Sequence, residues 1–218
     1  MAALFRPQAN LLAKFGFIGI VVSILAGIGW WWGYPRTNYS RQEFWTVHQP
    51  VMFSHEHHVG GLGIDCRFCH TSVTTSSNAG MPPTYTCMTC HSQVWTNAEM
   101  LAPVRQSLAR NEPIVWHRVY NLPDYTFFDH SIHITKGVGC AECHGEINRM
   151  PLTYKAVDLE MTFCIDCHQN PAPHLRPRTE IFNMEWTRTA ATPSPRQLMA
   201  EYNVRAGGVL LECSTCHR

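Results

Sequence analysis

The sequence predicts a mostly α-helical protein with extensive loops and one transmembrane helix near the N-terminus. Two observations support this: an uncharged apolar run at Phe15–Trp32, and ten cysteines that all fall within one repeated motif. The composition, 45% hydrophobic and 15% charged, is ordinary to slightly apolar for a folded chain. The formal net charge of +1 provides no basic field, which argues against a nucleic-acid partner.

The repeated motif is Cys-x-x-Cys-His, and its five copies are numbered first to fifth in sequence order. In a c-type cytochrome the two cysteines bind the vinyl arms of a haem and the adjacent histidine binds the iron. The cysteines are Cys66, Cys69, Cys87, Cys90, Cys140, Cys143, Cys164, Cys167, Cys213 and Cys216. The proximal histidines are His70, His91, His144, His168 and His217. We therefore predict five covalently bound c-type haems.

Two other uses of Cys-x-x-Cys are structural disulfides and zinc knuckles. Zinc does not require a histidine after every second cysteine, and a disulfide between residues three apart is strained. No cysteine is left over outside the five motifs. These features favour haem attachment over both alternatives.

A second element, Phe-x-His-x-x-His, also occurs twice. One copy, at Phe53–His58, precedes the first motif, and the other, at Phe128–His133, precedes the third. Histidines three apart lie on the same side of a helical turn, so each can face an iron. We predict that the sixth, distal iron ligands include His55, His58, His130 and His133.

The distal ligand of the remaining haem has two main candidates. His174 follows the fourth motif closely, and Met184 lies in an aromatic segment where its thioether would raise the reduction potential of its haem. The lesser candidates are His48, His57 and His117. If every iron has two protein ligands, no haem has an open position for a substrate, and the chain passes electrons without catalysing a reaction of its own.

The predicted organisation is an N-terminal tail and anchor at residues 1–35 and a haem domain at residues 36–218. A two-haem part would cover about 36–110 and a three-haem part about 111–218. With so little polypeptide per haem, the cofactors would supply much of the apolar core, so helices should be short. Thr96 and Glu99 read as a capping box that opens a helix to about Asn111, and Ser194 and Gln197 as another, for a helix from Pro195 to about Arg205.

Phe15–Trp32 is just long enough for a transmembrane helix, and an aromatic group at Trp30–Tyr34 would lie at the interface where it leaves the membrane. A cleaved signal peptide is the alternative, but bulky residues stand where a cleavage site needs small ones. Flanking positive charges are balanced and do not set the orientation. Since c-type haems are attached outside the cytoplasm, we expect a single-pass protein of the bacterial inner membrane with its haem domain on the periplasmic side.

The Phe-x-His-x-x-His element ahead of a haem motif resembles the ligand arrangement of the class III tetrahaem cytochromes. In that family the first histidine binds the haem attached just downstream and the second binds another haem. The resemblance implies that His55 serves the haem of His70 and His130 the haem of His144, while His58 and His133 serve two others. It covers these motifs only, and the extra His57 leaves an ambiguity with His58.

The whole chain, with its anchor, five motifs and the segment from Asn121 to Gly145, is similar to the membrane-anchored pentahaem subunits (the ActA family) of alternative complex III. The resemblance implies an electron-transfer role in a quinol:electron-acceptor oxidoreductase of the respiratory chain. The implied partners are a polytopic quinol-binding membrane subunit, an iron–sulfur subunit, a monohaem cytochrome c and a periplasmic electron acceptor.

Two other functions fit the same motifs. One is a self-contained, membrane-anchored quinol dehydrogenase, which would need a quinol pocket and a haem with an open or weak sixth ligand. The other is a multihaem nitrite or hydroxylamine reductase. That class marks its active haem with an altered proximal ligand, whereas all five motifs here end in histidine.

Overall fold

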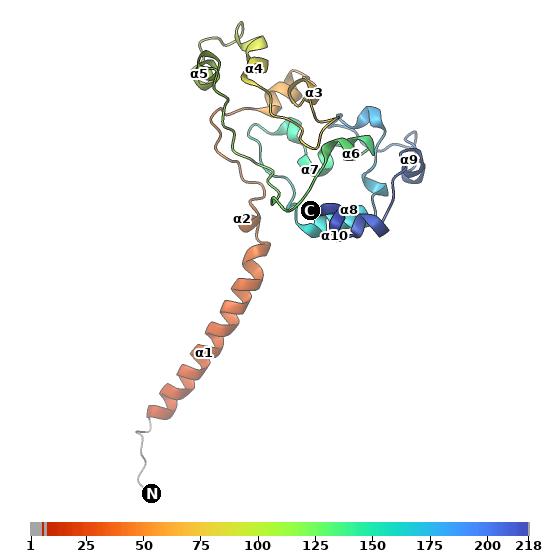
Figure 1. Cartoon of the computed structure of the whole chain (residues 1–218). Coiled ribbons are helices and arrows are strands. Elements are labelled where there is room, and N and C mark those ends of the chain that lie inside the picture. The colour runs from red at the N-terminus through yellow and green to blue at the C-terminus, as the bar shows by residue number, and fades with distance from the viewer. Residues whose placement is uncertain (1–5, 7, 218) are drawn as a thin grey trace. The chain divides into compact units, whose positions relative to one another are not determined.

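The computed structural model describes residue 6 and residues 8–217, and its contacts divide the chain into two units after Glu43. Figure 1 shows a chain of helices and loops. The described residues form helices and no β-strand, with three isolated antiparallel bridges at Thr46–Tyr154, Thr126–His217 and Val138–Leu175. The prediction of a mostly α-helical chain with extensive loops is confirmed.

The first unit is dominated by α1, Gln8–Gly33, which buries none of its residues against the protein. In the described part of the chain it belongs to the one span, Gln8–Arg36, that is long and apolar enough to cross a membrane. Its 26 residues extend about 39 Å at ~1.5 Å per residue, more than the ~30 Å hydrocarbon core of a bilayer. A short turn, η1 (Tyr34–Arg36), and α2 (Asn38–Arg41) follow it.

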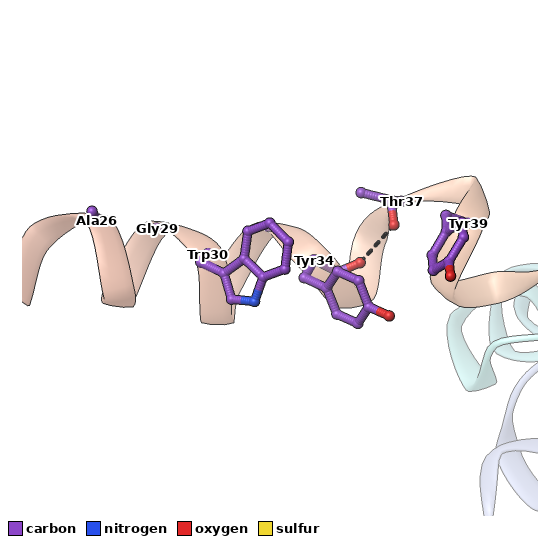
Figure 2. Close-up of a pocket in the computed structure, with 7 residues that line it drawn as sticks. Ala26, Gly29, Trp30, Tyr34, Thr37 and Tyr39 are labelled. Atoms are coloured by element: carbon purple, nitrogen blue, oxygen red, sulfur yellow. Dashed lines mark hydrogen bonds between the residues drawn. The ribbon is translucent and has the colours of Figure 1, made fainter. Parts of the chain in front are cut away.

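Aromatic side chains gather at the C-terminal end of α1, as Figure 2 shows. Trp30 stacks on Tyr34 with ring centroids 5.2 Å apart, and Arg36 lies over the ring of Trp32 at 4.4 Å. The Thr37 hydroxyl donates to the Tyr34 carbonyl at 2.8 Å. Such rings, apolar in body and polar at one edge, are typical of a membrane–water interface.

The second unit, residues 44–218, consists of short helical segments, many of them only one turn long. The haem motifs lie on or next to α3 (Cys66–Cys69), α4 (Thr84–His91), α7 (Ala141–His144), α8 (Met161–Gln169) and α10 (Cys213–Cys216). The other helical segments are η2 (Glu56–Gly61), η3 (Glu99–Leu101), α5 (Ala102–Arg110), α6 (His130–Thr135), η4 (Ile147–Arg149), η5 (Ala172–His174), η6 (Arg178–Glu180), α9 (Pro195–Glu201) and η7 (Gly208–Leu211).

The predicted helix from Thr96 to Asn111 is wrong at its start. The chain turns at Trp95, where φ is +56°, and α5 begins only at Ala102, with Pro103 in its first turn. Proline favours that position because its missing N–H needs no partner there. Val104 is buried against the protein, whereas Met100 and Leu108 are 52% and 44% exposed.

The predicted capping box of α9 is confirmed, because the Gln197 N–H donates to the Ser194 hydroxyl and the Ser194 N–H to the Gln197 side chain. The helix ends at Glu201, before the expected Arg205, and Asn203 has a φ of +49°. Helix α9 buries Leu198 against Leu175, in a small cluster that also includes Tyr202. Only four large side chains are fully buried in the described chain, Met150, Leu175, Ile181 and Leu198. This small apolar core is consistent with cofactors that supply part of the interior.

Candidate functional site: paired histidines beside Cys-x-x-Cys-His motifs

Each Phe-x-His-x-x-His segment forms a short turn that holds two imidazoles against one phenylalanine ring. Phe128 lies edge-on to His130, with ring centroids 4.8 Å apart, and stacks on His133 at 4.4 Å. The Phe53–His58 segment repeats this arrangement, at 4.9 Å to the first histidine and 4.3 Å to the second. Asp129 caps the turn of α6 by accepting from the Ser131 backbone N–H. The repeat seen in the sequence is therefore a repeat of three-dimensional geometry.

Most of the histidines are held by the same ring nitrogen. Nδ1 lies against a backbone carbonyl oxygen at 2.6–3.3 Å in His58, His70, His91, His117, His130, His133, His168 and His217. A carbonyl can only accept, so in a neutral imidazole Nδ1 carries the proton and Nε2 keeps its lone pair. A hydrogen bond from Nδ1 to a carbonyl is typical of histidines that bind a metal through Nε2.

Three histidines of the Phe-x-His-x-x-His segments face proximal histidines of haem motifs. The pairs are His130 with His144 at a centroid distance of 6.4 Å, His133 with His168 at 6.2 Å, and His58 with His91 at 6.1 Å. The ring planes are inclined by 15° and 19° in the first two pairs and by 65° in the third.

These separations suit one iron between each pair of rings. A metal–imidazole bond is about 2.0 Å long and the ring centroid lies about 1.1 Å behind the bonding nitrogen, so two imidazoles on opposite sides of one metal have centroids roughly 6.3 Å apart. In the described part of the chain, no group of three or more His, Cys, Asp or Glu side chains is arranged so that it could hold a metal ion. A haem needs only two protein ligands because its porphyrin supplies four nitrogens, so the side chains fit a haem better than a zinc knuckle.

A fourth pair, His55 and His70, lies within electrostatic reach. Burial and then the neighbouring His70 lower the pKa of His55 to about 4. The Nδ1 of His55 lies 2.9 Å from the hydroxyl of Thr153. Burial also lowers the pKa of His144 to about 4, with contributions from His130 and His70. Each imidazole is therefore neutral near pH 7, which is the form that binds a metal.

All ten motif cysteines are free thiols in the structure. Burial raises the pKa of Cys143 to about 12 and that of Cys140 to about 11. These thiols are protonated at neutral pH, in contrast to the depressed pKa of cysteines that act as nucleophiles or redox centres. Cys90 and Cys213 are exposed, and the other eight are partly buried.

The distal ligand of the fifth haem is not identified by the contacts of His217. His217 contacts residues 125–126, with its Nδ1 3.3 Å from the Tyr125 carbonyl oxygen. His174 lies beside the third motif instead, because its Nδ1 is 2.8 Å from the carboxylate of Glu142. Met184 is partly buried next to Asn183. The assignment of either residue to this haem stays a prediction.

His57 and His58, ambiguous in the sequence, differ clearly in the structure. His58 faces His91, whereas His57 stacks on the exposed ring of Trp95 at 6.1 Å. His117 is held firmly: its Nδ1 bonds the His48 carbonyl at 2.7 Å, and its backbone pairs twice with the Gln49 side chain.

Sequence reasoning missed two aromatic roles. It noted that a phenylalanine precedes each histidine pair but gave it no function, and the structure shows it orienting both imidazoles. Tyr120 packs on His144 at 4.4 Å and accepts a hydrogen bond from the Ala156 N–H. Burial raises the pKa of Tyr120 to about 12. Tyr120 lies 20 or more residues from any haem motif, so no local spacing pointed to it.

No family model matches the chain. The chain is similar to the "Menaquinone reductase, multiheme cytochrome c subunit" of Nitratidesulfovibrio vulgaris (strain Hildenborough), with 35% identity over 129 residues. The alignment covers 59% of this chain and 57% of that relative. The likeness supports a multihaem cytochrome c, and it does not single out the alternative complex III subunit that the motifs resemble.

Proposed function

We propose that this chain is an electron-transfer subunit of a quinone-linked respiratory complex and that it carries five c-type haems. The observation that carries the proposal is the three histidine ring pairs, 6.1–6.4 Å apart, each beside a Cys-x-x-Cys-His motif. The menaquinone reductase name of the relative supports the link to quinone. The apolar helix α1 supports attachment to the bacterial inner membrane by a single pass. We place the haem domain on the periplasmic side because c-type haems are attached outside the cytoplasm.

In this proposal the haems supply one-electron redox chemistry and the polypeptide fixes where it occurs. His70, His91, His144, His168 and His217 bind the five irons on one side. The opposite ligands are His55 for the first motif, His58 for the second, His130 for the third and His133 for the fourth. In seven of these nine histidines a carbonyl bond to Nδ1 fixes the orientation of the ring and keeps the imidazole a good electron donor.

Saturated irons define what the site can do. An iron with two imidazole ligands has no position for a substrate, so it exchanges electrons without making or breaking bonds. The chain then tunes reduction potentials through its ligands and through burial. It is an electron carrier and relies on partner subunits for the quinone chemistry.

Two directions of electron flow fit this reading. In the alternative complex III arrangement, quinol oxidised in a polytopic membrane subunit supplies electrons that leave for a periplasmic acceptor, with an iron–sulfur subunit and a monohaem cytochrome c as further partners. In the menaquinone reductase arrangement, electrons run from a periplasmic donor to quinone. The motif resemblance favours the first direction and the name of the relative favours the second.

The test is purification of the native membrane complex with mild detergent, followed by identification of its subunits. Quinol-dependent reduction of the haems, with an iron–sulfur and a polytopic subunit present, would support the alternative complex III assignment. Haem-dependent reduction of a menaquinone analogue by a reduced periplasmic cytochrome would support the opposite direction. A chain that is recovered alone and does not react with quinones would contradict both.

Catalytic alternatives are tested on the chain itself. A self-contained quinol dehydrogenase or a nitrite or hydroxylamine reductase requires a haem with an open or weakly bound position. Turnover of quinol, nitrite or hydroxylamine by the isolated chain, together with a high-spin ferric signal, would replace the electron-carrier proposal. Low-spin spectra without turnover would support it.

A further inference from the structure

The two histidine-pair segments each join two haem motifs. In α6, His130 faces His144 of the third motif and His133 faces His168 of the fourth. In η2, His58 faces His91 of the second motif, and just before η2, His55 lies near His70 of the first motif. The third motif is therefore a neighbour of the fourth, and the first a neighbour of the second.

Hydrogen bonds agree with the junction of the first and second motifs. The Ile64 N–H donates to the His58 carbonyl at 3.0 Å, so the turn that holds His58 leads directly into the first motif. The Nδ1 of His70 lies 2.7 Å from the Gly80 carbonyl oxygen, in the loop that leads into the second motif.

The junction between these two pairs runs from the first motif to the third. The Glu56 N–H donates to the Met150 carbonyl at 3.0 Å, and the Nδ1 of His55 meets Thr153 at 2.9 Å, so the histidine segment ahead of the first motif packs on the chain just after the third. From the other side, the loop after the first motif holds α6, because the His130 Nδ1 bonds the Ser77 carbonyl at 2.8 Å. Burial and then Cys66 raise the pKa of Cys140.

The fifth motif joins the fourth. The Gly207 N–H donates to the His168 carbonyl at 2.9 Å, and the Nδ1 of His168 lies 3.2 Å from the Leu210 carbonyl, so η7, which leads into the fifth motif, packs directly on the fourth. Burial and then Cys216 raise the pKa of Cys164.

We infer that the haems follow one another in space in the order second, first, third, fourth, fifth, and that electrons are exchanged with partners at the second and fifth motifs. This inference rests on the proposed function. Each step oxidises one ferrous haem and reduces its ferric neighbour. In one direction quinol is oxidised to quinone, releasing two protons and two electrons that pass singly to a periplasmic redox protein; in the other, that protein supplies the two electrons and quinone takes up two protons to become quinol. The ends of the path are Cys87–His91 and Cys213–His217.

Surface exposure agrees with these ends. The two exposed motif cysteines, Cys90 and Cys213, belong to the second and fifth motifs, whereas both cysteines of the first, third and fourth motifs are partly buried. Within residues 44–218, Figure 1 shows α4 and α3 toward one end, α7 between, and α8 and α10 at the other. The order of the motifs along the sequence differs at one place: it would put the second motif between the first and the third.

The experiment uses the full-length, haem-loaded chain and two variants, His58→Met and His130→Met. A methionine ligand raises the reduction potential of its haem, so that haem can be held reduced and diamagnetic while the others stay ferric. Low-temperature electron paramagnetic resonance then measures the spin relaxation of the ferric haems. A haem that loses a paramagnetic neighbour relaxes more slowly, so the number of altered signals counts the neighbours of the reduced haem.

Under the proposed order His58→Met alters one ferric signal, because the second motif is terminal. His130→Met is the matched control and alters two, because the third motif is internal in both orders. Two altered signals in His58→Met would overturn the order while leaving the electron-carrier function intact. High-spin signals in the unaltered chain would instead contradict the proposed function.

A measurement on the unaltered chain covers the case in which a variant loses its haem. In the fully reduced protein all haems are diamagnetic, and nuclear Overhauser contacts between haem methyl groups report which haems adjoin. Contacts between the haems of the second and first motifs, with none between the second and third, are expected. A contact between the second and third would overturn the inference.

Discussion

Replacing His58 by glycine should open one iron, at the second motif, and leave the other haems as they are. The ring of His58 lies 6.1 Å from that of His91, close to the roughly 6.3 Å expected for two imidazoles on one metal. Glycine has no side chain that could bind the iron or block the space. The variant should therefore bind about one carbon monoxide per chain in the ferrous state, or about one for every five haems.

His57→Gly is the matched control. His57 is the sequence neighbour of His58 and also a histidine, but it stacks on Trp95 instead of facing a proximal ligand. Its removal should leave carbon monoxide uptake at the level of the unaltered chain. Both variants are measured by optical titration of the reduced, undenatured protein. Equal uptake by the two variants, or uptake by His57→Gly alone, would refute the assignment of His58 to the second motif.

Three more predictions follow from the geometry. The haem of the second motif should give a more anisotropic low-spin electron paramagnetic resonance signal than the haems of the third and fourth. Its two imidazole planes are inclined by 65°, against 15° and 19° in the other pairs, and inclined rings leave the iron dπ orbitals nearly degenerate. Equally rhombic signals from all three haems would contradict the pairings. Thr153→Val should raise the reduction potential of the first-motif haem in a spectroelectrochemical titration, because His55 loses its partner at 2.9 Å. The rise should be at most about 40 mV for a hydrogen bond worth ~1 kcal/mol, and an unchanged potential would exclude a tuning role for this bond. Ser194→Ala should lower the thermal unfolding midpoint by roughly 2–4 °C, since losing an N-cap costs ~1 kcal/mol. Ser92→Ala should not, because Ser92 follows the end of α4 and its side chain makes no hydrogen bond within the described part of the chain.

Features that depend on a few adjacent residues were predictable from the sequence. The apolar run gave α1, Ser194 and Gln197 gave the start of α9, and the spacing of His130 and His133 gave the turn of α6. Each of these follows from local hydrogen bonding or from helical periodicity. The predicted start of the helix failed because the backbone is still extended at Ala98, and the 3-10 turn η3 then leads into α5, which has a proline in its first turn.

The pairing of distal with proximal histidines could not be worked out from the residues alone. His58 and His91 are 33 positions apart, and His133 and His168 are 35 apart, so their meeting depends on loops whose course has no periodic signal. The resemblance to class III cytochromes implied the partners of His55 and His130, and the structure brings His130 opposite His144. For His58 and His133 it implied only that they serve other haems.

A histidine pair on one turn is well suited to an electron path because it fixes two irons with one rigid element. Phe128 contacts both imidazoles of its turn, so the two ring planes cannot move independently, and the relative position of two haems follows from a single local structure. Electron transfer slows steeply with distance, so a fixed spacing between neighbours is the property that such a subunit must maintain. In the same way, Phe53 contacts both imidazoles of its own turn, which serve the first and second motifs. The fifth motif stands outside both turns. Its neighbour η7 packs on the fourth motif through the Leu210 carbonyl on His168, and its own Cys216 and His217 bond the segment at residues 125–127. The four histidines of the two turns are assigned to the other motifs, so the position of the fifth haem depends on these loop contacts instead of on a shared turn.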